Sequence, residues 1–247
     1  LHQKNIELLY SNANLEEFAY VASHDLKEPL RKISTFGDLI LSSDKEKFSP
    51  DGKLYLEKIV SSAKRMQTMI NDLMALSTIT GNKTYEQQDL NEIVAEVVNV
   101  LEYNLKDKNA TITYDNLPII NVVRPQFVQL FQNLISNSLK FSRPGVEPHI
   151  RITSARLNPT DAAAYGLTEK REYVMLRLED NGIGFENEYA GKIFTIFQRL
   201  HGKSEYEGNG IGLSICRKVV ENHKGVIHAQ GVVNQGAVFT IVLPAYL

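Results

Sequence analysis

The first 80 residues carry apolar side chains at helical rather than strand spacing. At about 100° of rotation per residue, nine apolar or small positions before about residue 41 fall within roughly 40° of one line. They are Leu8, Leu15, Ala19, Ala22, Leu26, Leu30, Ile33, Gly37 and Ile40. We predict one long helix with a kink near Asp25, because the Pro29 ring clashes with the carbonyl four positions earlier. Its heptad-like start, residues 1–16, is typical of a signalling helix.

A second helix is predicted to begin at Ser49 and Pro50, with serine as N-cap and proline at the first helical position. Seven positions then follow at alternating spacings of three and four, which is a heptad seam typical of a coiled coil. They are Leu56, Ile59, Ala63, Met66, Ile70, Leu73 and Ser77. Two helices cannot bury both seams alone, so we expect a homodimer in which two hairpins form a four-helix bundle.

The rest of the chain alternates strand and helix patterns after a breaker-rich linker at 80–84. A capped helix is predicted from Asp89 onward. Strands are expected at 110–115, 119–123, 149–157, 172–179, 225–232 and 237–243, helices at 125–141, 187–197 and 211–223, and a surface loop at 158–170. This order favours an α/β sandwich, a mixed sheet covered on one face by helices. We therefore expect two domains, 1–80 and 88–247.

Composition narrows the choice of partners and location. The formal net charge is −2, which argues against a nucleic-acid surface. No apolar run approaches the length of a membrane span, so we expect no membrane contact in this stretch. One cysteine excludes an internal disulfide and fits a cytoplasmic location. The chain begins with Leu1 and lacks a signal-peptide pattern, so we expect it to be part of a longer protein with a sensor domain upstream.

A first glycine motif, Asp-Asn-Gly-Ile-Gly at 180–184, directly follows a predicted strand. Its glycines allow the backbone to approach a ligand closely. Asp180 can accept a hydrogen bond from an exocyclic amine such as that of adenine. The alternative is an ordinary glycine turn after a strand.

A second glycine motif, at 208–213, opens the predicted helix that runs to His223. Glycines before a helix N-terminus are typical of a phosphate site. The spacing differs from the Rossmann fingerprint, and Phe197 stands where a P-loop needs glycine. The polar stretch 201–208 before it is expected to form a lid, and Arg199 at its edge can reach a phosphate or simply be solvated.

Asn133, Asn137 and Lys140 share one face of the helix predicted over 125–141. Amide oxygens and one lysine suit a magnesium-phosphate group. A solvated polar face is the plain alternative.

These motifs, in this order, resemble those of the histidine kinases of two-component signalling. Residues 133–141 resemble the N box of that family, 180–184 and 208–212 its two glycine boxes, 194–197 its F box and 18–31 its H box. The resemblance implies a Bergerat-type ATP-binding fold for the second half, with ATP and Mg²⁺ as cofactors. The nucleotide-binding residues it implies are Asn133, Asn137, Lys140, Phe141, Asp180, Gly182, Gly184, Arg199, Gly208, Gly210, Gly212 and Leu213, with Asn137 as the magnesium ligand.

The resemblance also makes His24 the phosphoacceptor. His24 lies about 160° from the centre of the apolar line, so it is expected to face solvent. Asp25 can hold the proton of one ring nitrogen and leave the other as nucleophile. We expect in-line attack on the γ-phosphate of ATP, followed by transfer to an aspartate of a response-regulator receiver domain. Whether attack occurs within a chain or across the dimer stays open.

Two other functions fit the sequence less well. A nucleotide-driven conformational machine, like the gyrase and chaperone ATPases, would not need a phosphoacceptor such as His24. A degenerate module that only dimerises would not need the full set of motif residues. Glu28 departs from the Thr or Asn that many family members carry four residues after the phosphoacceptor. Because an ionised glutamate only accepts hydrogen bonds, we expect weak phosphatase activity.

Overall fold

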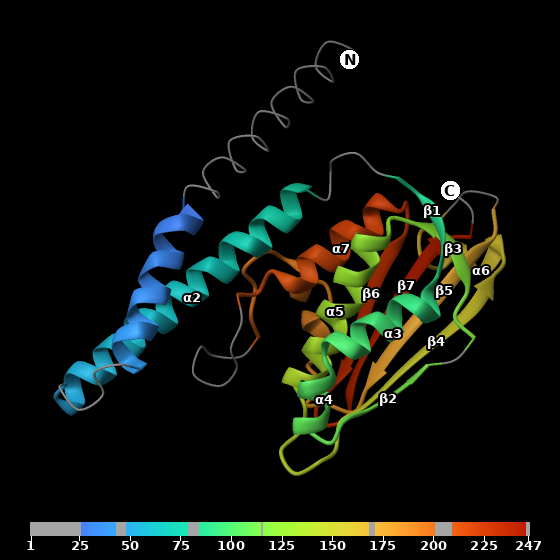
Figure 1. Ribbon diagram of the computed structural model, residues 1–247. Helices are drawn as coiled ribbons and strands as arrows, with labels where there is room; N and C mark the ends of the chain where they lie inside the picture. The colour runs from blue at the N-terminus through green and yellow to red at the C-terminus, as the bar shows by residue number, and fades with distance from the viewer. Residues whose placement is uncertain are drawn as a thin grey trace. The chain divides into compact units, whose positions relative to one another are not determined.

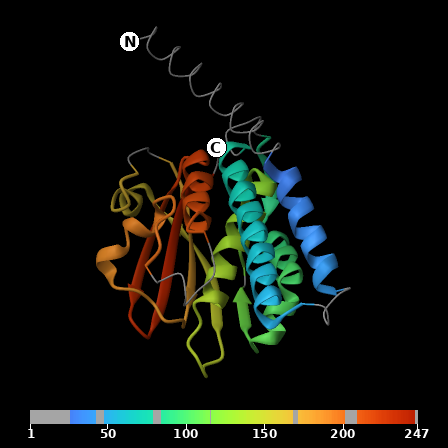
Figure 2. The same ribbon diagram turned by 90° about the vertical axis from the view of Figure 1, so that its left-hand side faces the viewer.

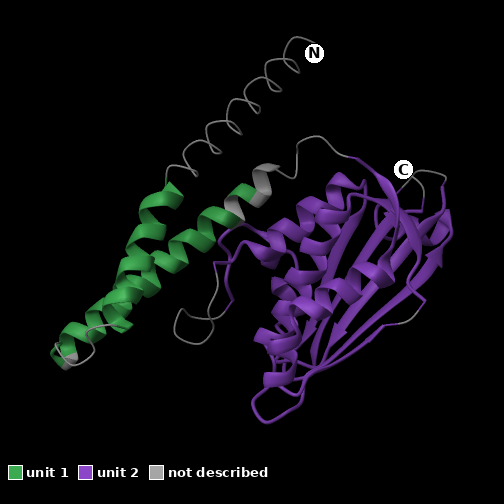
Figure 3. Ribbon diagram, in the orientation of Figure 1, with its two compact units in different colours: residues 1–81 green, residues 82–247 purple. Residues whose placement is uncertain are grey.

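The computed structural model describes residues 26–42, 48–78, 84–114, 116–167, 171–200 and 209–245. The chain divides into two compact units, residues 1–81 and residues 82–247 (Figure 3). Each unit is described by itself.

The first unit contains two described helices, residues 26–42 and α2 (Pro50–Thr78). Ser49 caps α2 as predicted, because its Oγ accepts the Gly52 N–H at 3.1 Å. The helix is continuous from residue 26 to residue 42, with Pro29 in its first described turn. The kink predicted near Asp25 lies outside the described residues, as do the helical positions predicted before Leu26.

Small side chains bring these two helices close together. A Cβ added at Gly37 would lie 2.2 Å from Val60 Cγ2, so only glycine fits there. Leu30, Ser34, Val60 and Ala63 are buried beside this contact. A single chain leaves other apolar positions open to solvent, including Ile59 at 54% and Met66 at 46% exposure. The side chains of Leu73 and Ser77, which complete the predicted seam, lie outside those that the structure describes.

The second unit is built on a mixed sheet, as predicted, but the sheet has five strands, and the strand expected at 119–123 belongs to a separate sheet (Figure 1). In spatial order its strands are β2 (Thr111–Tyr114), β4 (His149–Leu157), β5 (Tyr173–Asp180), β7 (Gly236–Pro244) and β6 (Val226–Val232). β2 and β4 are parallel, and the other neighbouring pairs are antiparallel. A sheet with both parallel and antiparallel strand pairs is what the predicted α/β sandwich requires.

Helices α3 (Leu90–Val100), α5 (Arg124–Lys140) and α7 (Gly212–Asn222) lie against one face of this sheet (Figures 1 and 2). The core beneath them includes Phe127 and Phe131 of α5, whose rings meet edge to face. Because strand side chains alternate between faces, Leu176 and Leu178 of β5 are buried on the same face of the sheet. A short helix, α4 (Glu102–Asp107), follows α3.

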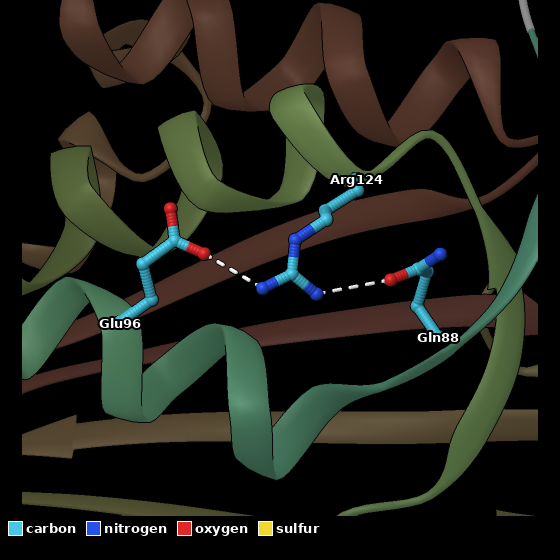
Figure 4. A network of polar contacts seen from close by, with 3 residues as sticks. All are labelled: Gln88, Glu96 and Arg124. Carbon is cyan, nitrogen blue, oxygen red and sulfur yellow. Dashed lines mark hydrogen bonds and ion pairs between the residues drawn. The ribbon is translucent and has the colours of Figure 1, made fainter.

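A second, two-stranded sheet was not predicted. In it β1 (Glu86–Asp89) pairs antiparallel with β3 (Ile119–Val122). Arg124, the first residue of α5, fixes this corner because its guanidinium donates to Gln88 Oε1 at 3.0 Å and to Glu96 Oε2 at 2.7 Å (Figure 4). The predicted cap of α3 is present, since Asp89 Oδ1 accepts the Asn91 N–H at 2.8 Å.

Two predictions about local structure were wrong. Residues 187–197 form two short 3-10 turns, η1 (Asn187–Tyr189) and η2 (Lys192–Phe194), rather than one helix. Gly191 separates them, and Phe197 has a φ of +64°, which no right-handed helix allows. The predicted loop at 158–170 contains a helix, α6 (Pro159–Ala163), because Asn158 caps it and Ala162 is buried against Tyr173 and Val242.

Tyr85 fastens the beginning of the second unit to the end of α7. Its hydroxyl donates to the carbonyl of Asn222 at 2.9 Å, and its ring meets the buried His223 edge to face. His223 in turn accepts the Val123 N–H at its Nε2, at 3.0 Å. The first residues of the second unit are therefore held by a hydrogen bond and ring packing against the end of α7.

Candidate functional site

The carboxylate of Asp180 stands at the end of β5 among three hydrogen-bond donors. Oδ2 accepts from Ser138 Oγ at 3.0 Å, and Oδ1 accepts from the backbone N–H groups of Gly182 at 2.9 Å and Ala237 at 3.1 Å. Burial raises the pKa of Asp180, and these three hydrogen bonds oppose that shift. A carboxylate can accept about four hydrogen bonds, so Asp180 has the chemistry to receive one more donor from a ligand.

Glycines let the backbone close tightly around Asp180. A Cβ on Gly182 would lie 2.6 Å from the carbonyl oxygen of Phe141, and a Cβ on Gly184 would lie 2.1 Å from that of Val232. Gly184 also has a φ of +62°, a region that side chains other than glycine rarely adopt. The first glycine motif is thus packed between the end of α5 and the hairpin of β6 and β7.

Three residues of this corner were not predicted. Ser138 and Ala237 bind the Asp180 carboxylate, and Gly236 lies where a Cβ would be 1.8 Å from the Asp180 carbonyl oxygen. Ser138 shares a helix with the predicted Asn137, but its partner is 42 residues away in the sequence. The turn signal at 234–236 was readable, but no local pattern shows that this turn packs against Asp180.

The polar face predicted on α5 is half-buried at Asn133, Asn137 and Lys140. The Asn133 amide donates to the carbonyl of Gly212 at 3.2 Å, which joins the N-box segment to the second glycine motif. Asn137 lies one turn further along α5 from Asn133, and its backbone carbonyl accepts the Phe141 N–H at the end of the helix. Lys140 Nζ lies 4.4 Å from the centre of the Phe141 ring.

The second glycine motif prepares the N-terminus of α7. Gly212 is the first residue of α7, and the preceding Ile211 gives the helix no side-chain cap. Gly210 has a φ of +71°, and its carbonyl accepts the Phe197 N–H at 2.9 Å. An 11-residue helix that begins without a capping side chain presents backbone N–H groups to an anion.

The remaining predicted residues fall into two groups. Leu213, in the first turn of α7, and Arg199 are half-buried. Gly208, the lid segment 201–208, His24 and Asp25 lie outside the described residues. Glu28 forms an ion pair with Lys32, four positions later on the same helix, at 2.8 Å.

The described ranges contain neither a cluster of metal-binding side chains nor a membrane-spanning helix. Within them, no group of three or more His, Cys, Asp or Glu side chains could hold a metal ion. The same ranges include no helix that combines the length and apolar character needed to cross a bilayer.

A carboxylate held at the end of β5, two glycine motifs and an uncapped helix N-terminus, all on a helix-covered mixed sheet, are typical of an ATP-binding domain of Bergerat type. Residues 122–247 match the family model described as "Histidine kinase-, DNA gyrase B-, and HSP90-like ATPase". Residues 14–82 match "His Kinase A (phospho-acceptor) domain". The chain therefore belongs to the histidine kinase family, and the resemblance drawn from its sequence motifs is confirmed.

Similar proteins agree with this assignment. Cyanobacterial phytochrome A of Nostoc sp. is 34% identical over 239 residues, which cover 96% of this chain and 29% of that protein. Phytochrome-like protein Cph1 of Synechocystis sp. is 33% identical over 237 residues, or 95% and 30%. The crystal structure of full-length ShkA in complex with AMPPNP has a TM-score of 0.68 at 19% identity, covering 92% of this chain and 45% of that one. At that identity the likeness shows the shared fold.

Proposed function

We propose that this chain transfers the γ-phosphoryl group of ATP to its own His24 and then to an aspartate of a response-regulator receiver domain. One observation carries the proposal. The match to the phospho-acceptor domain, residues 14–82, includes His24, and the same chain carries the nucleotide-site geometry around Asp180. We assign phosphotransfer and dimerisation to residues 1–80 and catalysis to residues 88–247.

We assign the adenine base and the phosphates of ATP to different residues of the site. Asp180 accepts the exocyclic amine of adenine, and Gly182 and Gly184 allow the loop to lie flat against the base. The N-terminus of α7 and Lys140 bind the phosphates. The Asn137 amide oxygen holds Mg²⁺, with Asn133 beside it, and bound Mg²⁺ neutralises charge on the phosphates. The three hydrogen bonds that hold the Asp180 carboxylate, the half-buried Asn137 on α5 and the uncapped N-terminus of α7 support this arrangement.

The transfer step needs little chemistry from the protein besides positioning. Asp25 accepts the N–H of one His24 ring nitrogen, which leaves the lone pair of the other nitrogen for attack. A nitrogen–phosphorus bond forms as the bond from the γ-phosphorus to the bridging oxygen breaks, and ADP leaves.

We further propose that the functional unit is a homodimer. Described apolar side chains on the helices of the first unit remain exposed in one chain, among them Leu26 at 54%, Phe36 at 60% and Ile59 at 54%. Burying these side chains against a second hairpin would remove them from water, which favours a four-helix bundle. A sensor domain in the full-length protein, a signalling helix before His24 and a cytoplasmic location stay predictions.

Incubation with γ-labelled ATP tests the proposal. Label on the protein that is labile to acid and stable to base identifies phosphohistidine. Free phosphate without protein label would instead indicate an ATPase, and neither signal would indicate a scaffold. Mixing His24→Ala chains with Asn137→Ala chains then separates the two routes of attack. Label on the Asn137→Ala chain requires transfer across the dimer, whereas its absence from the mixture indicates transfer within one chain.

A further inference from the structure

Arg143, three residues after the end of α5, joins two segments of the nucleotide corner. Its Nε donates to the carbonyl of Asn181 at 2.8 Å, and its Nη1 donates to the carbonyl of Asn234 at 2.9 Å. Asn181 immediately follows Asp180 in the glycine loop, and Asn234 lies in the turn between β6 and β7. The same turn leads to Ala237, whose N–H binds the Asp180 carboxylate.

Further hydrogen bonds also hold the loop that Arg143 binds. The Ile183 N–H donates to the carbonyl of Phe141 at 2.9 Å, and the Ile183 carbonyl accepts the Asn234 N–H at 2.7 Å. The Asn181 amide binds the start of β4 and the residues before it, since its Oδ1 accepts the His149 N–H at 2.8 Å and its Nδ2 donates to the Glu147 carbonyl at 2.9 Å. The Asn181 carbonyl is bound by Arg143, so both the side chain and the carbonyl of the residue next to Asp180 are held.

We propose that Arg143 is a positioning residue for recognition of the adenine base, an inference that rests on the nucleotide-binding function proposed above. The Asn181 carbonyl belongs to the Asn181–Gly182 peptide, whose N–H donates to Asp180 Oδ1 at 2.9 Å, so a movement of that carbonyl also turns the donor that aims the carboxylate. Adenine presents an amine donor at its six-position, whereas guanine presents a carbonyl acceptor there. A carboxylate only accepts hydrogen bonds, so a firmly aimed Asp180 favours adenine and rejects guanine.

The guanidinium is suited to this role because its donors are spread over a rigid planar fork. A lysine at the same position presents a compact charge that cannot reproduce two separated, directed contacts. Replacement by lysine should therefore retain part of the preference for adenine that Arg143 provides, and replacement by methionine should remove all of that contribution.

The test uses the 247-residue chain as Arg143→Met and Arg143→Lys, with Arg156→Met as a matched control. Arg156 is an exposed arginine of β4 outside the site. Dissociation constants are measured by calorimetry for AMP-PNP, ADP and GMP-PNP. Loss of the charged contacts should weaken AMP-PNP and ADP binding equally, by about tenfold in Arg143→Met. GMP-PNP binding should stay unchanged, Arg143→Lys should be intermediate, and Arg156→Met should behave as wild type.

Equal weakening of adenine and guanine nucleotides, or no weakening of either, would overturn the inference. A second measurement repeats Arg143→Met in an Asp180→Asn chain, where the base preference should not change further because Arg143 acts through Asp180. A further change there would also overturn it. If Asp180→Asn itself leaves ATP binding unchanged, the proposed role of Asp180 in nucleotide binding is wrong. That result differs from one in which Asp180→Asn weakens binding and only the Arg143 variants show no effect. Thermal unfolding without nucleotide checks each fold, and the Arg143→Lys selectivity ratio decides the matter if the methionine variant does not fold.

Discussion

Replacing Asp180 by asparagine should separate nucleotide binding from folding. The asparagine Oδ1 can keep both backbone contacts, from the N–H groups of Gly182 and Ala237. Its Nδ2 then replaces Oδ2 and can donate to Ser138 Oγ. The hydroxyl proton of Ser138 can turn to the carbonyl of Leu134, which is 3.2 Å away. The internal hydrogen bonds of the corner are therefore preserved in the variant.

The same change reverses the polarity that a ligand meets. An adenine amine would face an amide donor in place of a carboxylate acceptor. Losing one charge-assisted hydrogen bond is worth about 1.5–3 kcal/mol, so ATP should bind roughly 10- to 100-fold more weakly. Calorimetric titration with AMP-PNP measures this loss, and thermal unfolding of the nucleotide-free chain measures stability. An Asp180→Asn chain that binds AMP-PNP as tightly as wild type would refute the assignment of Asp180.

Stability should move in the opposite direction from binding. Because burial raises the pKa of Asp180, the folded state holds its proton more tightly than the unfolded state does. The wild-type chain therefore loses stability relative to Asp180→Asn as the pH rises from the ordinary carboxyl pKa of 3.8 through the raised pKa of the folded state. Above that window the difference is constant. Denaturant unfolding of both chains across this range should show the asparagine variant gaining relative stability with increasing pH, and a relative loss would contradict the cause given for the shift.

His24→Ala should abolish protein labelling and leave the dissociation constant for AMP-PNP unchanged, because His24 and Asp180 lie in different units; phosphohistidine in this variant would remove His24 from its role. Residues 1–80 alone should dimerise through their exposed apolar side chains, and sedimentation that finds only monomer at micromolar concentration would count against the four-helix bundle. The chain with ADP should barely accelerate decay of its phosphorylated regulator, since the exposed Glu28 carboxylate pairs with Lys32 and cannot donate a hydrogen bond to an attacking water. Rapid decay with return transfer to His24 excluded would show that this argument is mistaken.

The fold was predictable where one local pattern decided the element. Alternating apolar side chains marked the strands of the large sheet, and Asp89 and Ser49 marked helix starts that the structure confirms. The strand β1 was missed because its sequence, Glu-Gln-Gln-Asp, has no apolar alternation, and only pairing with β3 makes it a strand. The helix predicted over 187–197 failed because Gly191 and the positive φ of Phe197 outweigh the apolar spacing.

The same distinction between local patterns and long-range contacts applies to the residues of the candidate site. Glycine runs and the Asn-Asn-Lys face are local, so the sequence indicated Asp180, Gly212 and Asn137. Ser138 and Arg143 could not be found in this way, because each acts on a partner 38 or more residues distant. A polar residue whose partner is brought to it only by folding leaves no spacing signal of its own.

The contact between Tyr85 and the end of α7 sets a rule for engineering chimeric kinases. A catalytic module cut at residue 88 would lose the first two residues of β1 and the Tyr85 hydroxyl that binds the Asn222 carbonyl. It would also expose the buried imidazole of His223, against which the Tyr85 ring packs. A junction that grafts this module onto a foreign helical hairpin should therefore fall at or before residue 84. The module then keeps Tyr85 and its contacts with Asn222 and His223.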